Sequence, residues 1–335
     1  MRRKLNITAL VDEAEVRPGD PDFQNEPSEP ITEYHVIHAL RELGYRVTVL
    51  PATQDICAMV TALNRNRPDL VFNLTEQLAG DRTHDKNIAA LLEMLELPYT
   101  GAGPTALMLC RDKPLCKQLL SLHKIRVPGF ASFEPGAAIR PRGGLRYPLV
   151  VKPALEDSSE GVSNASLVNN DAELTERVRF VHDRWQQPAI AEEYVPGREL
   201  YVAILGNKRL KVLPPRECFF KAPPGQGPQL ATYRVKWNPA YREKWKIEFG
   251  FAQLEPHLAA AVSRTCRKAY HILQIRDYGR IDLRLTPDNR VVVLEANPNP
   301  DLAYGEEVAE AAEKAGLPYE KFIDHLVKLA LRRYR

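Results

Sequence analysis

The sequence has 335 residues and 44% of them are hydrophobic, so it is long enough to bury a substantial core and to form two or three subdomains. Its 46 basic and 43 acidic side chains nearly balance and are spread along the chain, which argues against a nucleic-acid or membrane partner. No uncharged run is long enough to span a bilayer, and the five cysteines form no Cys-x-x-Cys pair. We therefore expect free thiols, no zinc site and a cytoplasmic protein.

The first hundred residues alternate between strand-like and helix-like segments. Strands are expected at 5–11, 45–50 and 70–74, and helices at 31–43, up to about 65, and at 88–95. Alternation with short connections is typical of a parallel, doubly wound sheet. We predict an N-terminal α/β domain over residues 1–103, in which the acidic, Pro-rich segment 17–30 forms a loop.

The central residues, 104–213, are predicted to form a separate α+β unit with an antiparallel sheet. Asp112 lies near the start of the second of two helices, and Asp171 is expected to cap a later helix. A Gly206-Asn207 turn between apolar runs indicates a hairpin. The expected strands are 147–153, 161–168, 189–194, 199–205 and 208–213.

The remaining residues, 214–335, are predicted to form a third subdomain. Its first part, 215–250, is rich in Pro, Gly and Lys and is expected to be a lid or a long loop. The rest should contain a helix at 255–273 and two strands, 279–285 and 290–295, joined by a tight turn. Two helices are expected near the C-terminus.

The strongest chemical pattern lies on the two expected strands of this third subdomain. Glu295 and Asn297 are two residues apart on a strand, so they share a face that Asp282 of the partner strand can join. Two carboxylates and an amide oxygen are hard ligands suited to Mg²⁺ that also binds nucleotide phosphates. The alternative interpretation of these residues is a pair of edge strands whose polar side chains simply face solvent. The run Asn-Pro-Asn-Pro at 297–300 favours a rigid loop at a strand end instead.

Two further segments have weaker patterns that point to phosphate and nucleoside binding. Lys152 ends an apolar strand, where pairing with phosphate or snorkelling to water explains it equally well. The small polar loop at 156–163 offers backbone N–H groups and hydroxyls to phosphate oxygens. The segment 191–199 turns at Pro-Gly between glutamates, and it reads either as a nucleoside-contacting strand or as an ordinary charged hairpin.

The order of these segments resembles that of the ATP-grasp superfamily, and within it of the D-alanine–D-alanine ligases. The motifs that match in order are Arg-Asp-Lys (111–113), Val-Val-Lys-Pro (150–153), the Ser-Ser loop (158–159), Glu-Glu-Tyr-x-Pro-Gly-Arg-Glu (192–199), Gly-Arg-Ile-Asp (279–282) and Leu-Glu-Ala-Asn-Pro (294–298). The match runs from about Asp69 to the C-terminus. It implies an ATP-grasp fold in which two α+β subdomains clasp ATP behind a parallel N-terminal domain.

The resemblance also implies a role for each matching residue. ATP would be held by Lys113, Lys152, Ser158, Ser159, Glu192, Tyr194, Val195, Glu199 and Lys236. Two Mg²⁺ ions, with Mn²⁺ as an alternative, would be bound by Asp282, Glu295 and Asn297. Arg280 and Ser158 would be catalytic, Arg280 by stabilising negative charge on an acyl phosphate and on the tetrahedral intermediate. The implied partners are amino acids, small peptides or amines, and the implied assembly is a homodimer.

The segments on the substrate side depart from the D-alanine–D-alanine ligase pattern. Asp301 stands where these ligases have a glycine of a Ser-Pro-Gly-Met-Thr type segment, and Glu306 falls where a substrate-binding serine is usual. The stretch 75–85 and Asp157 also differ. Acidic groups there would repel a substrate carboxylate, so we predict a different second substrate, with Asn299, Asp301 and Glu306 as candidate contacts.

Three alternatives remain open from the sequence. The first is a carboxylate–amine ligase whose second substrate is not D-alanine, with a cationic substrate group meeting Asp301 or Glu306. The second is a D-alanine–D-alanine ligase. The third is a nucleotide-binding protein without catalysis, since a fold alone does not establish an activity. Asp301 has a structural alternative as well, because an aspartate at this place can cap the next helix.

Overall fold

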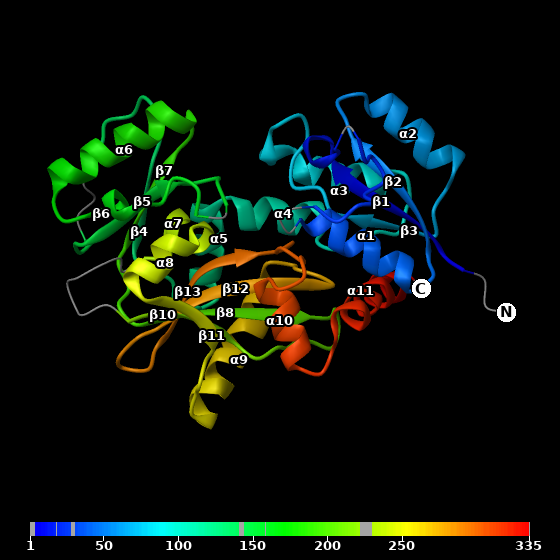
Figure 1. The fold of residues 1–335 in the computed structure, drawn as a ribbon. Coiled ribbons are helices and arrows are strands. Elements are labelled where there is room, and N and C mark those ends of the chain that lie inside the picture. The colour runs from blue at the N-terminus through cyan, green and yellow to red at the C-terminus, as the bar shows by residue number, and fades with distance from the viewer. Residues whose placement is uncertain are drawn as a thin grey trace.

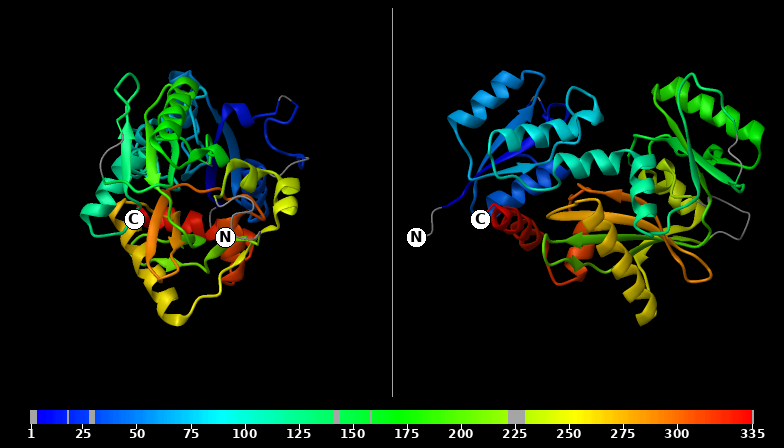
Figure 2. Two further views of the ribbon diagram at one scale, coloured as in Figure 1. Left: turned by 90° about the vertical axis from the view of Figure 1, so that its left-hand side faces the viewer. Right: turned by 180° about the vertical axis from the view of Figure 1, so that it is seen from behind.

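The computed structural model describes residues 4–17, 19–27, 31–140, 144–157, 159–221 and 230–334. The described strands form three sheets, which helices cover (Figure 1). The views in Figure 2 place the N-terminal domain and the four-stranded sheet at opposite ends of the six-stranded sheet. None of the described helices is both long and apolar enough to cross a membrane.

The N-terminal domain contains the parallel sheet that the alternating pattern predicts. Its strand order is β2-β1-β3, and the bounds are β1 Asn6–Asp12, β2 Arg46–Ala52 and β3 Leu70–Asn73. Every residue of β3 is buried, as expected of an apolar run between covering helices. Those helices are α1 Thr32–Glu42, α2 Ile56–Arg65 and α3 Asp85–Met94, with short 3₁₀ helices at Glu13–Glu15 and Arg82–His84.

The central sheet is antiparallel, with strand order β4-β7-β5-β6 and with one long helix packed on it. Its strands are β4 Phe130–Phe133, β5 Leu149–Pro153, β6 Leu167–Val168 and β7 Ala189–Glu193. The helix is α6 Asp171–Trp185, and α4 Pro104–Arg111 and α5 Lys113–Leu122 lead into the sheet.

Two local predictions for this central unit were wrong. The strand expected at 161–168 is reduced to β6, preceded by a 3₁₀ helix at Asn164–Ser166 whose capping box turns the backbone. The cap of α6 is Asn170 rather than Asp171, because Asn170 has extended backbone and its side chain accepts from the Glu173 N–H at 3.0 Å. Asp112 does cap α5, accepting from the Leu115 N–H at 2.9 Å.

The third sheet has the order β11-β10-β8-β12-β13, with β9 paired to β8. Its strands are β8 Arg198–Leu205, β9 Lys211–Val212, β10 Arg216–Phe220, β11 Ile247–Phe251, β12 Tyr278–Leu285 and β13 Val291–Asn297. Helix α9 Pro256–Ile272 contributes to the core beneath it, while α10 Glu307–Lys314 and α11 Tyr319–Arg333 share a core with α1.

The subdomain limit expected at residue 213 does not coincide with the sheets. Strands β8 and β9 were assigned to the central unit, but β8 pairs with β12 over its whole length. All residues of β8 after Arg198 are buried, and such a strand is stable only inside a sheet that is covered on both faces.

The segment predicted as a lid or long loop, 215–250, is largely regular structure. It contains β10, α7 Tyr233–Trp237, α8 Pro239–Trp245 and β11, with α7 packed on the sheet through the fully buried Val235. The Pro- and Gly-rich run that suggested a loop, 222–229, lies outside the described residues.

Candidate active site

A pocket of about 800 Å³, counting its opening, lies between the four-stranded and six-stranded sheets. It collects side chains from β5, β7, β12 and β13, from the loop after β5 and from α7. The residues expected to contact ATP or metal that line it are Lys113, Lys152, Ser159, Glu192, Tyr194, Val195, Glu199, Lys236, Asp282 and Glu295. Ser158, the remaining expected phosphate-loop residue, lies outside the described residues.

One wall of the pocket is a buried cluster of two lysines and a glutamate. Lys152 on β5 and Lys117 on α5 both place Nζ 3.3 Å from Oε1 of Glu192 on β7. Burial lowers the pKa of Lys117, although the Glu192 charge opposes that effect. For Lys152 burial acts in the same direction, but Glu192 and then Glu295 outweigh it and raise the pKa above its usual value. Lys152 is therefore a charged group beside the pocket.

A third lysine connects this wall to β13. Lys113 is the first residue of α5 and 4% exposed, with Nζ 3.1 Å from Oε1 of Glu295 and a hydrogen bond to the Glu156 carbonyl. Burial tends to raise the pKa of Glu295, but Lys113, Lys152 and Lys236 outweigh it and hold that pKa far below its usual value. Glu295 is thus an ionised carboxylate among three lysines, and this excess of cations suits a polyanion such as a triphosphate.

The expected metal ligands lie together where the middle of β12 pairs with the C-terminal part of β13. Asp282 pairs in register with Glu295, and the Asn297 side chain donates to Asp282 Oδ2 at 3.2 Å. A β-bulge between Asp282 and Leu283 breaks the regular pairing at this point. Two carboxylates and an amide on one face fit hard divalent cations. Across the described residues no three His, Cys, Asp or Glu side chains form a group that could hold a metal ion by themselves.

Arg280 stands beside these ligands and already has two acidic partners. Its Nε and Nη2 donate to the two Asp282 oxygens at 2.7 and 3.0 Å, and its Nη1 donates to Glu307 Oε2 at 2.6 Å. These carboxylates outweigh burial and raise the pKa of Arg280 well above its usual range. The bidentate pairing fixes the plane of the guanidinium, which is the property that a binder of planar or tetrahedral oxyanions needs.

The opposite end of the pocket is built by the link between β7 and β8. Tyr194 and Val195 line the pocket, and the Glu199 carboxylate accepts from Arg284 and from the Tyr201 hydroxyl. Gly197 has a φ of +129°, and a Cβ there would lie 2.2 Å from the Leu285 carbonyl oxygen. Only glycine fits this close approach, which brings the β7–β8 link onto the end of β12.

The phosphate loop is connected to α7 through described residues. Ser159 has a φ of +62°, and its hydroxyl donates to the Ala231 carbonyl at 2.9 Å. Lys236 on α7 lies with Nζ 5.9 Å from the centre of the Tyr201 ring and faces the pocket. The loop after β5 and the α7 segment thus close one side of the pocket together.

The three candidate substrate residues lie in the loop after β13, away from the lining of this pocket. Asn299 Oδ1 accepts from the Ala102 N–H at 2.8 Å, which joins the loop to the N-terminal domain. Asp301 accepts from Thr32 of α1 and from the Ala303 N–H. The helix-capping alternative for Asp301 is wrong, since the residue at the N-cap of α10 is Glu306.

Several residues in or beside the site were missed from the sequence. Arg284 follows Arg280 and Asp282 at the strand period of two, so the alternation itself was an available signal. Lys117 was detectable only as a lysine on the apolar side of α5, and Glu307 had no local signal. Glu156 belongs to the expected phosphate loop, but its contact was not foreseen, because it accepts from Lys113 through the backbone carbonyl that any residue type provides.

Comparisons with known proteins agree with this arrangement. The sequence model of the family described as D-ala D-ala ligase C-terminus matches residues 135–328. The chain is 34% identical over 312 residues to the uncharacterized protein y4sG of Sinorhizobium fredii, covering 89% of this chain and 87% of that protein. It is 28% identical over 296 residues to the D-alanine–D-alanine ligase of Rhodospirillum rubrum, covering 87% and 89%.

Solved structures show the same fold. The D-alanine–D-alanine ligase of Bacillus anthracis complexed with ATP superposes with a TM-score of 0.76 at 20% identity, over 98% of both chains. The ligase of Coxiella burnetii gives a TM-score of 0.70 at 21% identity, over 99% of this chain and 95% of that one.

Proposed function

We infer the activity of this chain from its family, because the chain belongs to the family described as D-ala D-ala ligase C-terminus. It has the ATP-grasp fold and is an ATP-dependent ligase that forms C–N bonds. Its specific reaction, we propose, is the joining of a carboxylate to an amine through an acyl phosphate, with a second substrate other than D-alanine. The observation that supports the proposal best is the ionised Glu295 among three lysines, opposite Asp282 and next to Arg280.

The proposed roles follow from the position of each group in the pocket. Lys113, Lys152 and Lys236 would bind phosphate oxygens, and Ser158 and Ser159 would belong to the loop that closes over them. Tyr194 and Val195 would contact the base, with Glu192 beside it, and Glu199 would accept from ribose hydroxyls. Asp282, Glu295 and Asn297 would hold Mg²⁺, which when bound neutralises phosphate charge between the reacting anions.

The chemistry needs no nucleophilic side chain. The substrate carboxylate would take up the γ-phosphoryl group, and the amine would then attack the carbonyl carbon as phosphate leaves. Arg280, held in plane by Asp282 and Glu307, would stabilise the negative charge on the carbonyl oxygen and the departing phosphate.

The proposal that the second substrate is not D-alanine rests on the loop after β13. Asp301 and the half-buried Glu306 bring two acids to the place where a substrate carboxylate would lie. Burial, with Asp301 and Glu307, raises the pKa of Glu306 to about 7. A D-alanine–D-alanine ligase remains the second candidate. Catalysis in the family and the presence of Arg280 and the metal ligands argue against a protein that only binds nucleotide.

The test is an incubation of the purified protein with Mg²⁺, ATP and an array of D- and L-amino acids and amines, with phosphate release and product mass as readouts. We expect phosphate release that depends on a carboxylate–amine pair and is small with D-alanine alone. Full activity with D-alanine alone would establish the second candidate instead. ATP binding without phosphate release under any condition would contradict the proposed reaction.

The metal role of Glu295 leads to a separate prediction. Glu295→Gln is expected to raise the Mg²⁺ concentration needed for half-maximal activity by about tenfold or more, since loss of even an outer partner of a metal ligand costs about 10–100-fold. The measurement is a Mg²⁺ titration of phosphate release. Glu243→Gln, an exposed change on α8, is the control and should leave the titration unchanged. An unshifted Mg²⁺ dependence in Glu295→Gln would remove Glu295 from the metal site.

A cytoplasmic location is also proposed. All five cysteines are free and four of them are buried, which suits a reducing compartment.

A further inference from the structure

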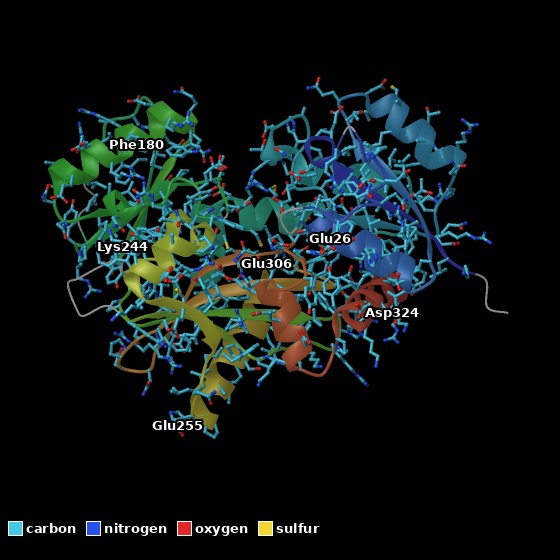
Figure 3. The ribbon with its side chains drawn as sticks, viewed as in Figure 1. Glu26, Phe180, Lys244, Glu255, Glu306 and Asp324 are labelled. Atoms are coloured by element: carbon cyan, nitrogen blue, oxygen red, sulfur yellow. The ribbon has the colours of Figure 1, made fainter. Side chains whose placement is uncertain are left out.

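Strand β12 carries a third charged side chain on the face that bears Arg280 and Asp282, and the reaction described above does not use it. Side chains alternate along a strand, so Arg284, two residues after Asp282, lies on the same face. The other end of this row lies at α10, because Arg280 donates to Glu307, the first residue of that helix, directly after the Glu306 that Figure 3 labels. Arg284 therefore lies at the end of the row away from Arg280.

Arg284 is paired with the acid that is expected to bind ribose. The two residues lie directly opposite each other in the antiparallel register of β12 and β8, and Nη2 of Arg284 donates to Oε2 of Glu199. Its Nη1 donates to the Gly197 carbonyl at 3.0 Å, which joins β12 to the β7–β8 link. Arg284 is 3% exposed and lines the pocket, and its Cζ lies 5.7 Å from the centre of the Tyr194 ring. It thus contacts both parts of the pocket wall that are expected to hold the nucleoside.

A second buried donor to Glu199 is Tyr201, two residues further along β8. Its hydroxyl donates to Oε1 at 2.9 Å, and the residue is 2% exposed. An ionised carboxylate has about four acceptor positions, two on each oxygen. Of the described residues, Arg284 takes one position on Oε2 and Tyr201 takes one on Oε1. Because Glu199 lines the pocket, the other position on each oxygen suits two donors on adjacent atoms, such as the 2′- and 3′-hydroxyls of a ribose.

The same pair determines the charge that a ligand meets at this end of the pocket. Burial tends to lower the pKa of Arg284, but Glu199 outweighs it and raises that pKa, so the guanidinium stays charged. Glu199 is 7% exposed. A carboxyl group so deeply buried that lost its cationic partner would tend to take up a proton, and it would then donate a hydrogen bond where a ribose hydroxyl needs an acceptor. Arg284 therefore keeps Glu199 an acceptor.

We propose that Arg284 is a positioning residue for the nucleotide: together with Tyr201 it orients Glu199 to accept from both vicinal hydroxyls of a ribose, so that the enzyme selects ribonucleoside triphosphates over deoxynucleotides. This rests on the proposed function, which assigns Glu199 to the ribose, and names the nucleotide class that the same site selects. Arg284 acts through Glu199, away from Arg280 and the metal ligands. Its substitution should therefore weaken nucleotide binding and leave kcat at saturating ATP within about threefold.

The test compares nucleotides that differ by one hydroxyl. The full-length protein with Mg²⁺ is titrated calorimetrically with ATP, 2′-deoxyATP and 3′-deoxyATP. We expect each deoxy analogue to bind about tenfold weaker than ATP or more, because a hydrogen bond to a charged acceptor contributes more than a neutral one. Equal affinity for the three nucleotides overturns the proposal.

Arg284→Met tests the residue directly, because it keeps much of the side-chain length and removes the hydrogen bonds to Glu199 and Gly197. We expect this variant to bind ATP about tenfold weaker and the deoxy analogues nearly as the unchanged protein does, so that the preference for ribose largely disappears. Arg290→Met, a change at an arginine that is 58% exposed in the turn after β12, is the matched control and should keep the preference. A preference that survives in Arg284→Met overturns the proposal.

Two further variants separate positioning from a general loss of structure. Arg284→Lys keeps a cation beside Glu199 but loses the planar fork, so it should recover part of the preference. Tyr201→Phe removes only the hydroxyl that donates to Glu199, and it should lower the preference for ATP over at least one deoxy analogue. If Arg284→Met does not fold, Tyr201→Phe decides the matter, and an unchanged preference in it overturns the proposal.

The two proposals fail in different ways. If phosphate release requires a carboxylate–amine pair but all three nucleotides bind alike, the ligase stands and Arg284 has no role in nucleotide selection. If the ribose preference and its loss in Arg284→Met are found without phosphate release under any condition, the nucleotide site stands and the proposed reaction does not. Absence of ATP binding overturns both.

Discussion

Arg280→Ala is expected to lower kcat for ligation by about 10²–10³-fold, the usual effect of removing one donor from an oxyanion-stabilising site. The guanidinium is held by both oxygens of Asp282 and by Glu307, so its position is fixed before a substrate arrives. Such a group stabilises charge that develops in the transition state without first reorganising. The measurement is phosphate release at saturating ATP and amine, with nucleotide affinity determined separately.

Because Arg280 also pairs with Asp282, an expected metal ligand, the Arg280→Ala experiment needs a control for indirect effects on metal binding. Arg280→Lys keeps the charge but loses the planar fork, and we expect it to recover only a small part of kcat. Arg290→Ala removes an arginine that is 58% exposed in the turn before β13 and should leave kcat unchanged. If Arg280→Ala instead changed only the Mg²⁺ dependence, Arg280 would be a positioning residue for Asp282 and not a contact of the reacting atoms.

Glu192→Gln is expected to lower the free energy of unfolding by about 3 kcal/mol, as the loss of one partner from a buried ion pair does. The substitution leaves two ammonium groups, Lys117 and Lys152, without their shared carboxylate, and their side chains are only 2% and 12% exposed. Urea denaturation at pH 7 measures the change.

The neighbouring Glu193 provides a matched control. It pairs with Arg146, whose side chain is 87% exposed, so Glu193→Gln should cost less than about 1 kcal/mol. A second variant, Glu192→Gln with Lys117→Met, removes one of the stranded charges and should recover part of the lost stability. Equal destabilisation by Glu192→Gln and Glu193→Gln would mean that the buried lysine cluster does not contribute as its geometry indicates.

The sequence was most informative where local periodicity and chemistry agree. The parallel N-terminal sheet followed from alternating segments, and the facing of Asp282 and Glu295 followed from two strands joined by a tight turn. These are short-range properties, since side chains alternate along a strand whatever it packs against. The ATP-grasp resemblance, read from motif order, is confirmed by the family match and by the fold.

Local patterns were misleading where the contacts of a segment are distant in sequence. Strand β8 follows the central unit along the chain, but it pairs with β12 some eighty residues later, because a strand that is buried after its first residue must be covered on both faces. The region 215–250 read as a loop from its Pro and Gly content, yet β10 and β11 pair within it and α7 packs through Val235. Composition reports local preference and not long-range pairing.

The sequence by itself determined the donor set of the site, that is, the lysines, carboxylates and amide whose types suit phosphate and magnesium. Only the tertiary structure decided how these charges are shared: Lys117 and Lys152 meet on Glu192, Lys113 pairs with Glu295, and Arg280 is held by Glu307. The physical reason is that a charge is stabilised by whatever lies within a few ångströms in space. Those neighbours come from elements that the chain brings together only when its three sheets have packed.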